Sequence, residues 1–419
     1  MLALYNTLAW VAKPFVFAWA AWHGRDPARA REFAQRTARE LPDPLRRSLW
    51  LHGASVGEAR LVSALSGPLR EAFPRCPQAV SANTSTGLAR LPEVEARFIV
   101  PFDFAGFPTR VLKRLDPRLL VLIETELWPN LIRETSAAGV PLALVNARLA
   151  AAKMSRYRRF SALYRPLIER FDLIGAQSAD DAERFASLGA STGSLTVTGN
   201  LKYDLAAPHV DRAALEARIG ISPDRQVWVA GSTRPGEEAI VLEAFGVLRR
   251  SFPELVLVLA PRHLERIEDV RALVRAAGWE PLSWSLLESD RSSKRDVVLI
   301  DTLGELATLY GVARVAFVGG SLKPFGGHSP LEPAAAEVPL MFGPHTDHFA
   351  EPARELLEAG GARRVTDASN LSATASVWLA DRGLRDRAGE AAGNVVRAHS
   401  GALRRTIDLL APVIERGMP

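Results

Sequence analysis

The sequence predicts an α/β protein made of two doubly wound halves, each built on a parallel sheet. From about residue 48, a short apolar run, a loop of small residues and a helical pattern follow one another repeatedly, and the same rhythm starts again near residue 226. Such alternation is typical of βαβ units, whose strands are parallel. A hydrophobic content of 47% over 419 residues is enough for two or three buried cores.

The expected strands are the short apolar runs of each half. In the first half they are SLWLHGAS, LLVLIETE, VPLALVNAR, FDLIGAQS and LTVTGN. In the second half they are QVWVAGS, LVLVLAPRH, DVVLIDT, VAFVGGS and VPLMFG. The helical patterns between them include GEARLVSALSGPLREAF and EEAIVLEAFGVLRRSF.

Composition shifts divide the chain into three expected parts. Residues 1–47 form an apolar segment with a basic flank, 48–205 a first Rossmann-like domain, and 206–419 a second one, closed by helices over about 384–415. The best candidate linker is about 201–225, where Pro208, Gly220 and Pro223 interrupt regular structure. Two Rossmann-like domains facing a central cleft would bind a ligand at the carboxyl ends of their strands.

The first 22 residues are strongly apolar and are followed by an Arg-rich stretch. This length is close to the roughly 20 residues that span a bilayer. Lys13 and Pro14 interrupt the segment, and the absence of a basic start and of a small-residue cleavage site disfavours a signal peptide. Three interpretations remain: a single anchor with its basic flank in the cytoplasm, a kinked helix at the membrane interface, or a helix docked on the protein itself.

Charge and cysteine content exclude several classes of protein. A net charge of +5 on a chain of this size is a poor argument for nucleic-acid binding. Cys76 is the only cysteine, so an internal disulfide, a zinc finger and an iron-sulfur site are excluded. The chain also lacks GxGxxG, Walker A and HExxH motifs, which disfavours nicotinamide, P-loop and zinc-protease chemistry.

A basic amphipathic helix is expected over Lys153–Phe171. Apolar residues recur there at three- and four-residue spacing, with five arginines between them. One interpretation is a surface helix that packs its apolar side on the core. The other is contact with anionic lipid headgroups or a phosphorylated acceptor.

Three carboxylates follow expected strands of the first half. Ser55 and Glu58 have the spacing of a capping box at the start of a helix, which would also leave Glu58 at the carboxyl end of the first strand as a possible base. Glu124 and Glu126 follow the apolar strand LLVLI, where an unpaired buried carboxylate would be costly. Strand alternation places these two on one face, and we expect one of them to point into the cleft. Lys202, at the junction of the halves, is a weaker candidate, either a charge partner or a solvated linker lysine.

Four strand-end loops of the second half could meet one phosphorylated ligand. Ser329, Pro330 and Glu332 have the pattern of a helix start, with amides aimed at the preceding loop. Arg262 in the loop Pro261–His263 offers a guanidinium fork for phosphate. The other two loops are Leu303–Gly304–Glu305 and Gly231–Arg234. His345 and His348 have HxxH spacing but no evident third ligand, so no metal site is expected.

Several long motifs in the same order resemble those of the 3-deoxy-D-manno-octulosonic acid (Kdo) transferases. The motifs are HxxSVGE at 52–58, ETELWPN at 124–130, VNARL at 145–149, VTGNLK at 197–202, and the runs PRH, GEL and FVGGSL with GGHxPLEP. The resemblance covers nearly the whole chain. It implies a GT-B glycosyltransferase fold, with an acceptor-binding first domain and a nucleotide-sugar-binding second domain.

The resemblance also implies an activity. Members of this family transfer Kdo from CMP-Kdo to a lipid A precursor (lipid IVA) in lipopolysaccharide synthesis, with inversion and without a metal or other cofactor, on the cytoplasmic face of the inner membrane. The implied partners are therefore CMP-Kdo, the lipid A precursor and an anionic membrane surface, and no nucleic acid. Glu58 would be the general base, and Glu124 and Lys202 would stabilise the transition state. The implied CMP site is Pro261, Arg262, Leu303, Gly304, Glu305, Ser329, Pro330, Leu331 and Glu332.

Four positions depart from the family pattern. Arg234 stands where the family usually has His, Ser329 replaces Asn, Leu264 replaces Pro after PRH, and Ser85 replaces Pro before Thr86. Ser and Asn are nearly equal N-caps, so Ser329 is compatible with a helix start. Arg234 adds a fixed charge that could alter the choice of donor or acceptor. Two alternatives therefore remain: a GT-B transferase with another nucleotide-sugar donor or envelope acceptor, and a nucleotide-sugar sensor without turnover.

Overall fold

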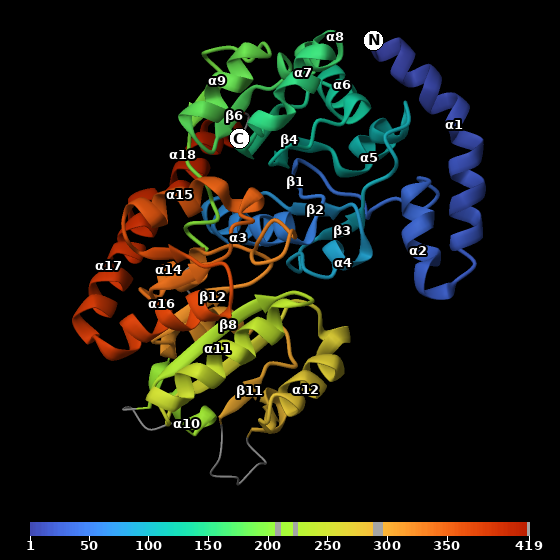
Figure 1. The fold of residues 1–419 in the computed structure, drawn as a ribbon. Helices are drawn as coiled ribbons and strands as arrows, with labels where there is room; N and C mark the ends of the chain where they lie inside the picture. The colour runs from blue at the N-terminus through green and yellow to red at the C-terminus, as the bar shows by residue number, and fades with distance from the viewer. Residues whose placement is uncertain (206–210, 221–224, 288–295, 417–419) are drawn as a thin grey trace. The chain divides into compact units, whose positions relative to one another are not determined.

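The computed structural model describes residues 1–205, 211–220, 225–287 and 296–416, and the chain divides into two compact units. Unit 1 contains Met1–Leu201 together with Ser400–Pro419, and unit 2 contains Lys202–His399. Each unit holds a seven-stranded sheet in which every pairing is parallel (Figure 1). The predicted α/β class with two Rossmann-like domains is therefore confirmed.

The sheet of unit 1 has the strand order β3-β2-β1-β4-β5-β6-β7. Its strands are β1 Ser48–His52, β2 Gln78–Ala82, β3 Ala96–Ile99, β4 Pro117–Ile123, β5 Leu142–Ala147, β6 Leu173–Ala176 and β7 Leu195–Val197. Its helices are α1 Leu2–His23, α2 Pro27–Arg36, α3 Val56–Ala72, α4 Ser85–Leu88, α5 Phe107–Leu115, α6 Pro129–Ala137, α7 Met154–Arg159, α8 Ser161–Ile168, α9 Ala179–Ser187 and α18 Ala402–Glu415, with a 3-10 turn at Ala151–Lys153.

The sheet of unit 2 has the strand order β10-β11-β9-β8-β12-β13-β14. Its strands are β8 Val227–Thr233, β9 Val256–Pro261, β10 Pro281–Ser283, β11 Val297–Leu299, β12 Val315–Val318, β13 Leu340–Phe342 and β14 Ala362–Arg364. Its helices are α10 Arg212–Ile219, α11 Glu237–Ser251, α12 Ile267–Ala276, α13 Leu306–Leu309, α14 Leu331–Ala335, α15 Ala350–Glu358, α16 Ala368–Ala380 and α17 Arg382–His399, with 3-10 turns at Leu264–Arg266, Trp284–Leu286, Tyr310–Val312 and Asp347–Phe349.

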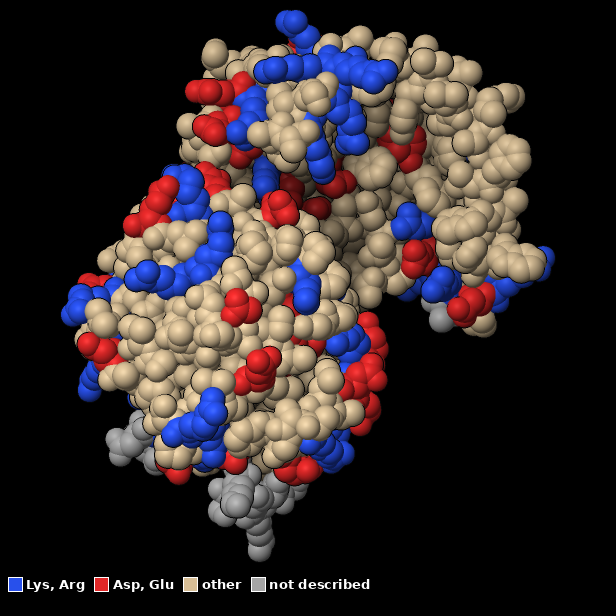
Figure 2. Space-filling model, viewed as in Figure 1, with Lys and Arg blue, Asp and Glu red and all other residues tan. Residues whose placement is uncertain are grey.

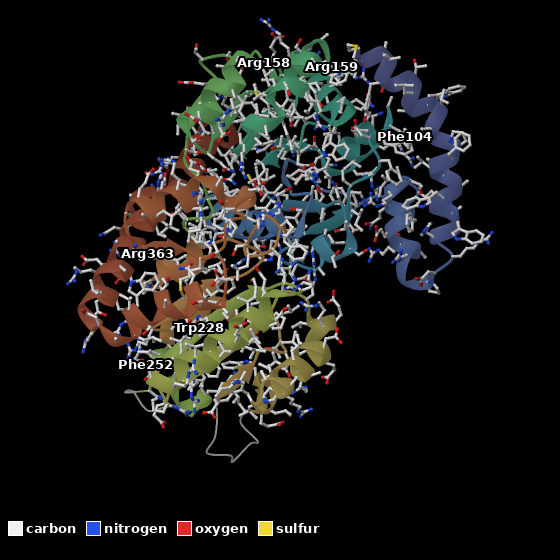
Figure 3. The ribbon with its side chains drawn as sticks, viewed as in Figure 1. Phe104, Arg158, Arg159, Trp228, Phe252 and Arg363 are labelled. Carbon is white, nitrogen blue, oxygen red and sulfur yellow. The ribbon has the colours of Figure 1, made fainter. Side chains whose placement is uncertain are left out.

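The strands read as continuous apolar runs because helices cover both faces of each sheet. Successive residues of β8 show this directly: Val227 and Val229 belong to one core cluster, whereas Trp228 and Ala230 belong to the cluster on the other face. Figure 3 labels Trp228 within unit 2. Each sheet therefore holds its strand ends rigidly, and the loops that follow the strands carry the polar side chains.

The C-terminal helices differ from the expectation. A second domain running to residue 419 was predicted, but only α17 belongs to unit 2, and α18 packs in unit 1 against α3, β4 and β6. Buried side chains of α18 face that unit, and Arg118 donates a hydrogen bond of 2.6 Å to the carbonyl of Ile414. Gly401, with a φ of +87°, allows the turn between the two helices.

The expected linker at about 201–225 is also different where it is described. The division between the units falls between Leu201 and Lys202. Residues 212–219 form α10, whose Ile219 is fully buried in the core of unit 2. The remaining parts of the expected linker, 206–210 and 221–224, lie outside the described residues.

The basic segment forms two short helices instead of one. α7 and α8 are separated at Phe160, and their buried residues are Met154, Tyr157, Leu167 and Ile168. The arginines are exposed, and Figure 3 shows Arg158 and Arg159 at the outer surface of α7. The interpretation as a surface element that packs its apolar side on the core is confirmed.

Helix α1 is docked on unit 1 along one side. It runs beside α2 and α5 (Figure 1), and its Tyr5 hydroxyl donates a 3.0 Å hydrogen bond to Asp103. The Lys13 ammonium lies 4.9 Å from the centre of the Phe107 ring and so points toward the protein. None of the helices within the described ranges combines the length and the apolar character needed to cross a bilayer.

Candidate active site

Glu58 lies at the carboxyl end of β1, in the first turn of α3. The Ser55 half of the predicted capping box is present: the Ser55 hydroxyl accepts a hydrogen bond from the Glu58 amide, at 3.3 Å, and also donates one to Glu58 Oε1, at 3.0 Å. The amide of Ala54 donates a 2.6 Å hydrogen bond to Oε2. Because Gly53 has no side chain, the strand end can approach Glu58 closely, where a Cβ would lie 3.0 Å from Glu58 Cβ. Glu58 is thus held in one orientation but remains half-buried rather than enclosed.

Glu124 and Glu126 leave the sheet at the end of β4. Glu124 has a φ of +63°, a left-handed conformation that costs a non-glycine residue about 1–2 kcal/mol. The strand alternation used to predict their directions therefore stops at Ile123. Glu126 Oε2 accepts a hydrogen bond from Trp128 Nε1 and lies 3.9 Å from Nε2 of the buried His52.

The structure brings the three carboxylates together within unit 1. The pKa of Glu58 is raised above its ordinary value, first by burial and then by the negative charges of Glu126 and Glu124. A carboxylate with a raised pKa is a stronger base once it is ionised. This environment raises the proton affinity of the Glu58 carboxylate.

Lys202 is the first residue of unit 2, and the segment before it is fixed by two contacts. The Leu201 amide donates a 2.9 Å hydrogen bond to Oδ1 of the buried Asn146, and Arg405 Nε donates a 2.8 Å hydrogen bond to the carbonyl of Thr198. The motifs VNARL and VTGNLK are therefore in direct contact. The structure tests no role of Lys202 beyond this placement.

Two further carboxylates of unit 1 fix the loop that carries Glu124 and Glu126. Asp103 accepts hydrogen bonds from the amides of Asn130 and Leu131 in the first turn of α6, at 2.9 and 2.8 Å. Glu134 of α6 in turn accepts from the amides of Gly106 and Thr109 at the start of α5, at 2.8 and 2.9 Å. Glu134 of α6 thus caps the start of α5, and Asp103, in the loop before α5, caps the start of α6. Burial raises the pKa of Asp103 to about 6.

In unit 2, basic side chains gather at the carboxyl ends of β8, β9 and β12. Thr233 of β8 is paired with Pro261 of β9, so Arg234, Arg262 and His263 leave the sheet at one edge. Arg234 Nη1 donates a hydrogen bond to His263 Nε2, and its guanidinium lies 4.5 Å from the centre of the Phe325 ring. This cluster includes the residue at which the sequence departs from the family pattern.

His328 completes the cluster from the glycine-rich loop after β12. Burial and the charges of Arg262 and Arg234 lower the pKa of His328 to about 4, so its imidazole is neutral near pH 7. The loop folds back through Gly326 and Gly327, which have φ values of +80° and +77°. A Cβ at Gly327 would lie 2.2 Å from the Phe349 ring, so only glycine fits there. A fixed positive potential around a neutral imidazole is suited to an anion.

Several polar atoms near these strand ends are buried without a hydrogen-bond partner among the described residues. They are Thr233 Oγ1, Arg234 Nε, Thr302 Oγ1, Glu305 Oε2 and His328 Nε2. Buried polar atoms in native proteins are usually paired, so each of these atoms can accept or donate a hydrogen bond to an ordered water or a polar ligand. Glu305 immediately precedes α13, whereas Leu303 and Gly304 are exposed beside it.

The helix start expected at Ser329 is wrong in detail. α14 begins at Leu331 and its N-cap is Pro330, whose side chain cannot accept a hydrogen bond. Ser329 Oγ is 3.4 Å from the Leu331 amide, a weak contact. Because α14 has only five residues, the helix dipole contributes little, and the positive charge at this site comes from the basic side chains. Leu331 and Pro261 are buried, and Glu332 is half-buried.

Glu237, at the start of α11, was not predicted from the sequence as a functional residue. Its fully buried carboxylate accepts four backbone N–H groups: Oε2 from Gly320 and Arg234, at 2.6 and 2.9 Å, and Oε1 from Ser321 and Leu322, at 2.9 and 2.8 Å. It thereby joins the loop after β8 to the loop after β12. Three of the four amides lie 83 to 85 residues away along the chain, and no local spacing signals them.

His345 and His348 lie beside the glycine-rich loop. The His348 amide donates to the carbonyl of Gly326, and the His345 amide donates to that of Ser321. Over the described ranges, no three His, Cys, Asp or Glu side chains are grouped as metal ligands.

Comparison with known proteins places these motifs in a family. Residues 28–205 match the family model described as 3-deoxy-D-manno-octulosonic-acid transferase. The chain is 32% identical to a 3-deoxy-D-manno-octulosonic acid transferase of Haemophilus influenzae over 99% of both chains. It is 36% identical to the enzyme of the same name from Bordetella pertussis, covering 93% of this chain and 92% of the relative. A glycosyltransferase structure from Rickettsia africae, with 10% identity and a TM-score of 0.58 over 89% of this chain and 100% of the other, shares the fold alone.

Proposed function

This chain belongs to the 3-deoxy-D-manno-octulosonic acid (Kdo) transferase family, and we propose that it transfers Kdo from CMP-Kdo to a hydroxyl group of a lipid A precursor, lipid IVA. It is thus a glycosyltransferase of lipopolysaccharide biosynthesis. The observation that carries the proposal is the carboxylate cluster of unit 1, in which Glu58 has the raised pKa that a base needs.

In the proposed reaction, the acceptor hydroxyl oxygen attacks the anomeric carbon of Kdo from the face opposite CMP. Its proton passes to Glu58, and the bond between the anomeric carbon and the phosphate oxygen breaks with its electron pair leaving on CMP. The configuration at the anomeric carbon is inverted. Glu124 and Lys202 are proposed to stabilise the charges that develop in this step.

Unit 2 is proposed to bind the donor. Arg262 and Arg234 would hold the phosphate, and Glu305, Thr302 and His328 offer the unpartnered polar atoms that a nucleotide could satisfy. The further contacts proposed for CMP are Pro261, Leu303, Gly304, Ser329, Pro330, Leu331 and Glu332. Transfer is proposed to need no metal or other cofactor, since arginine can balance the charge of the leaving phosphate.

The direct test is product formation measured by mass spectrometry with CMP-Kdo and a tetra-acylated lipid A precursor. A mass increase of one or more Kdo units is expected. Absence of product from a folded protein that binds CMP would contradict the proposed acceptor, and absence of CMP binding would contradict the donor.

Arg234 favours one alternative, a different nucleotide-sugar donor or another envelope acceptor. Its guanidinium is fixed between His263 and Phe325, in the proposed phosphate site. Competition between CMP and UDP for the native protein separates the two donors: weaker binding of UDP supports CMP-Kdo, and stronger binding of UDP supports the alternative.

Glu126→Gln is expected to shift the acidic limb of the pH profile of kcat/KM to lower pH. Of the two negative charges that raise the pKa of Glu58, that of Glu126 has the larger effect. Removing it lowers the pKa of Glu58 and keeps Glu58 ionised in more acidic solution. The profile is measured with saturating donor. Glu93→Gln, at an exposed position of the same unit, is the control and should have its acidic limb at the same pH as the native protein. If the acidic limb of Glu126→Gln also lies at the native pH, Glu58 is not the base that titrates there.

We also propose that α1 binds the cytoplasmic face of the inner membrane. Its side opposite the docked one exposes large apolar residues, among them Trp10 and Phe15, both 74% exposed. Figure 2 shows almost no charged side chain along this part of the surface. The exposed arginines of α7 and α8 would add attraction to anionic headgroups.

Replacing Trp10 and Phe15 together by Ser is expected to weaken binding to vesicles of phosphatidylethanolamine and phosphatidylglycerol by about ten-fold or more. The measurement is co-sedimentation at several lipid concentrations. Leu286→Ser with Val377→Ser removes two exposed apolar side chains of unit 2 and serves as the matched control. Equal loss in both double variants would contradict a specific role of α1.

A further inference from the structure

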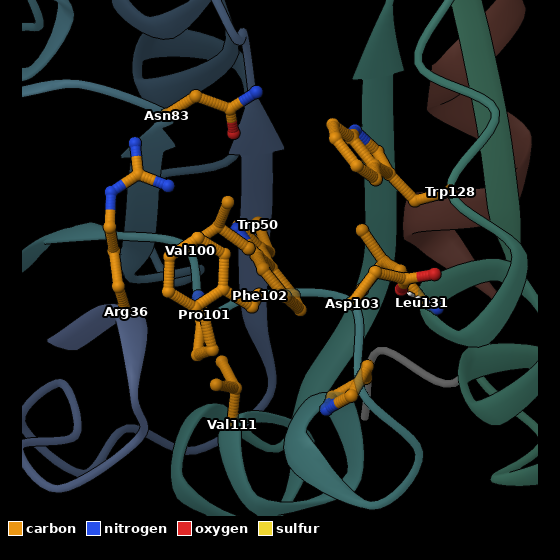
Figure 4. A pocket seen from close by; sticks show the side chains of 11 residues that line it. Arg36, Trp50, Asn83, Val100, Pro101, Phe102, Asp103, Val111, Trp128 and Leu131 are labelled. Carbon is orange, nitrogen blue, oxygen red and sulfur yellow. Dashed lines mark hydrogen bonds between the residues drawn. The ribbon is translucent and has the colours of Figure 1, made fainter. Parts of the chain in front are cut away.

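An apolar cavity of about 210 Å³ lies inside unit 1, next to the carboxylate cluster. Its walls are Trp50, Val100, Phe102, Val111, Trp128 and Leu131 (Figure 4). Arg36 and Trp128 lie at opposite sides of the cavity, and Asn83 lies at one end.

The charged groups at the cavity are already engaged with protein. Both oxygens of Asp103 accept hydrogen bonds, from the amides of Asn130 and Leu131 and from the Tyr5 hydroxyl. Arg36 pairs with Glu32 at 3.2 Å, and its guanidinium lies 5.2 Å from the centre of the Phe102 ring. The cavity therefore offers apolar contact rather than an ionic site.

One polar atom at the cavity is available to a ligand. Asn83 Oδ1 is buried and has no hydrogen-bond partner among the described residues. An occupant should therefore be an apolar chain that carries a hydrogen-bond donor, an amide N–H or a hydroxyl, close to one end. A free hydrocarbon would leave this atom unpaired.

The cavity adjoins the proposed base. The backbone N–H of Asn83 donates a 3.3 Å hydrogen bond to the carbonyl of Ala54, and the backbone N–H of Ala54 donates to the Glu58 carboxylate. On the other side, Trp128 donates to Glu126. A molecule with its reacting hydroxyl at Glu58 can therefore extend an attached chain into the cavity.

The wall of the cavity is also tied to α1, the helix with the exposed apolar side. Tyr5 bonds to Asp103, and Asn6 Oδ1 accepts a 2.8 Å hydrogen bond from Asn130 Nδ2. A lipid held at the surface beside α1 is thus close to the cavity, which favours a lipid chain over a soluble apolar compound as the occupant.

From these contacts we infer that the cavity binds one acyl chain of the acceptor. The part of the acyl chain that it holds is the part next to the sugar, where an amide or hydroxyl group can donate to Asn83 Oδ1. The inference rests on the proposed function, because it takes the acceptor to be an acylated sugar. The part of the acyl chain that is bound in the cavity would leave the bilayer, and it would fix the position of the sugar relative to Glu58. Acceptors with a longer acyl chain should therefore bind more tightly than those with a short one.

The first test measures binding without donor or turnover. The probes are N-butanoyl and N-decanoyl glucosamine phosphate below their micelle concentrations, titrated by calorimetry. The native protein is expected to bind the decanoyl compound at least about ten-fold more tightly. Val100→Trp, at a half-buried wall position, fills the cavity and should abolish that difference, whereas Val377→Trp, 51% exposed in unit 2, should keep it. A folded Val100→Trp protein that retains the difference would overturn the inference.

A second measurement does not depend on the folding of Val100→Trp. A decanoyl probe brominated at its chain end should quench fluorescence of the native protein more than that of Trp128→Phe, because Trp128 lines the cavity. Equal quenching in the two proteins at saturation would also overturn the inference. If the native protein transfers no Kdo yet shows both effects, the proposed function fails and only the binding of an acyl chain in the cavity stands. Transfer without either effect removes only the cavity assignment.

Discussion

Glu58→Gln is expected to lower kcat for Kdo transfer by about 10² to 10⁴, the usual contribution of a positioned general base. The amide side chain has nearly the same shape and can still accept the hydrogen bond from Ala54, but it cannot take the proton of the acceptor hydroxyl. CMP affinity should remain close to that of the native protein, because the donor is proposed to bind unit 2. Single-turnover kinetics with mass-spectrometric detection and a separate CMP titration measure the two effects.

The capping role of Glu58 needs its own control. Ser55→Ala removes the other half of the same capping box and is expected to cost about 1 kcal/mol of stability, with a loss in kcat of less than about ten-fold. If Ser55→Ala and Glu58→Gln slow transfer equally, Glu58 acts by fixing the start of α3. If neither slows it, another residue is the base.

Glu237→Ala is expected to lower the free energy of unfolding of unit 2 by about 3–5 kcal/mol. The substitution leaves four backbone N–H groups without an acceptor, and the buried position admits little water to replace the carboxylate. The loops after β8 and β12 would then separate, so CMP affinity should fall as well. Urea denaturation followed by circular dichroism, with hydrogen exchange of Gly320–Leu322, measures the loss.

Glu243→Ala on the exposed side of α11 is the matched control and should change stability by no more than about 0.5 kcal/mol. Glu237→Gln gives a milder case if the Ala variant does not fold, because it keeps one acceptor oxygen. Unchanged exchange of Gly320–Leu322 in Glu237→Gln would contradict the role of this carboxylate in holding the loop.

Local patterns predicted much of the fold and part of the site. The strands were predicted because a strand covered on both faces is apolar throughout. Glu58, Glu124 and Arg262 were then chosen as candidates because each follows the end of a predicted strand. The N-cap at Ser55 was predictable because its hydrogen bond with the Glu58 amide lies within one helical turn. The short helix at Leu331 shows the limit of this reasoning, since the sequence pattern of a cap at Ser329 was present but the helix began one residue later, with Pro330 as its N-cap.

Partners distant in sequence could not be predicted in this way. Asp103 caps a helix that begins 26 residues later, and three of the four amides that Glu237 binds are more than 80 residues away. Neither residue has a local pattern that distinguishes it from a surface carboxylate. Glu124 illustrates a different limit: its left-handed backbone ends the strand alternation, and no residue type next to it signals that change.

The return of α18 to unit 1 has a consequence for the order of folding during synthesis. Unit 2 is one continuous stretch of chain and can fold as soon as it has left the ribosome, whereas unit 1 needs two stretches that are made at different times. Until Ala402–Glu415 is made, the surface of α3, β4 and β6 that α18 covers stays open to solvent. The nascent protein must therefore hold its first domain unfinished while its second is translated, and that interval is when chaperones or aggregation would act on it.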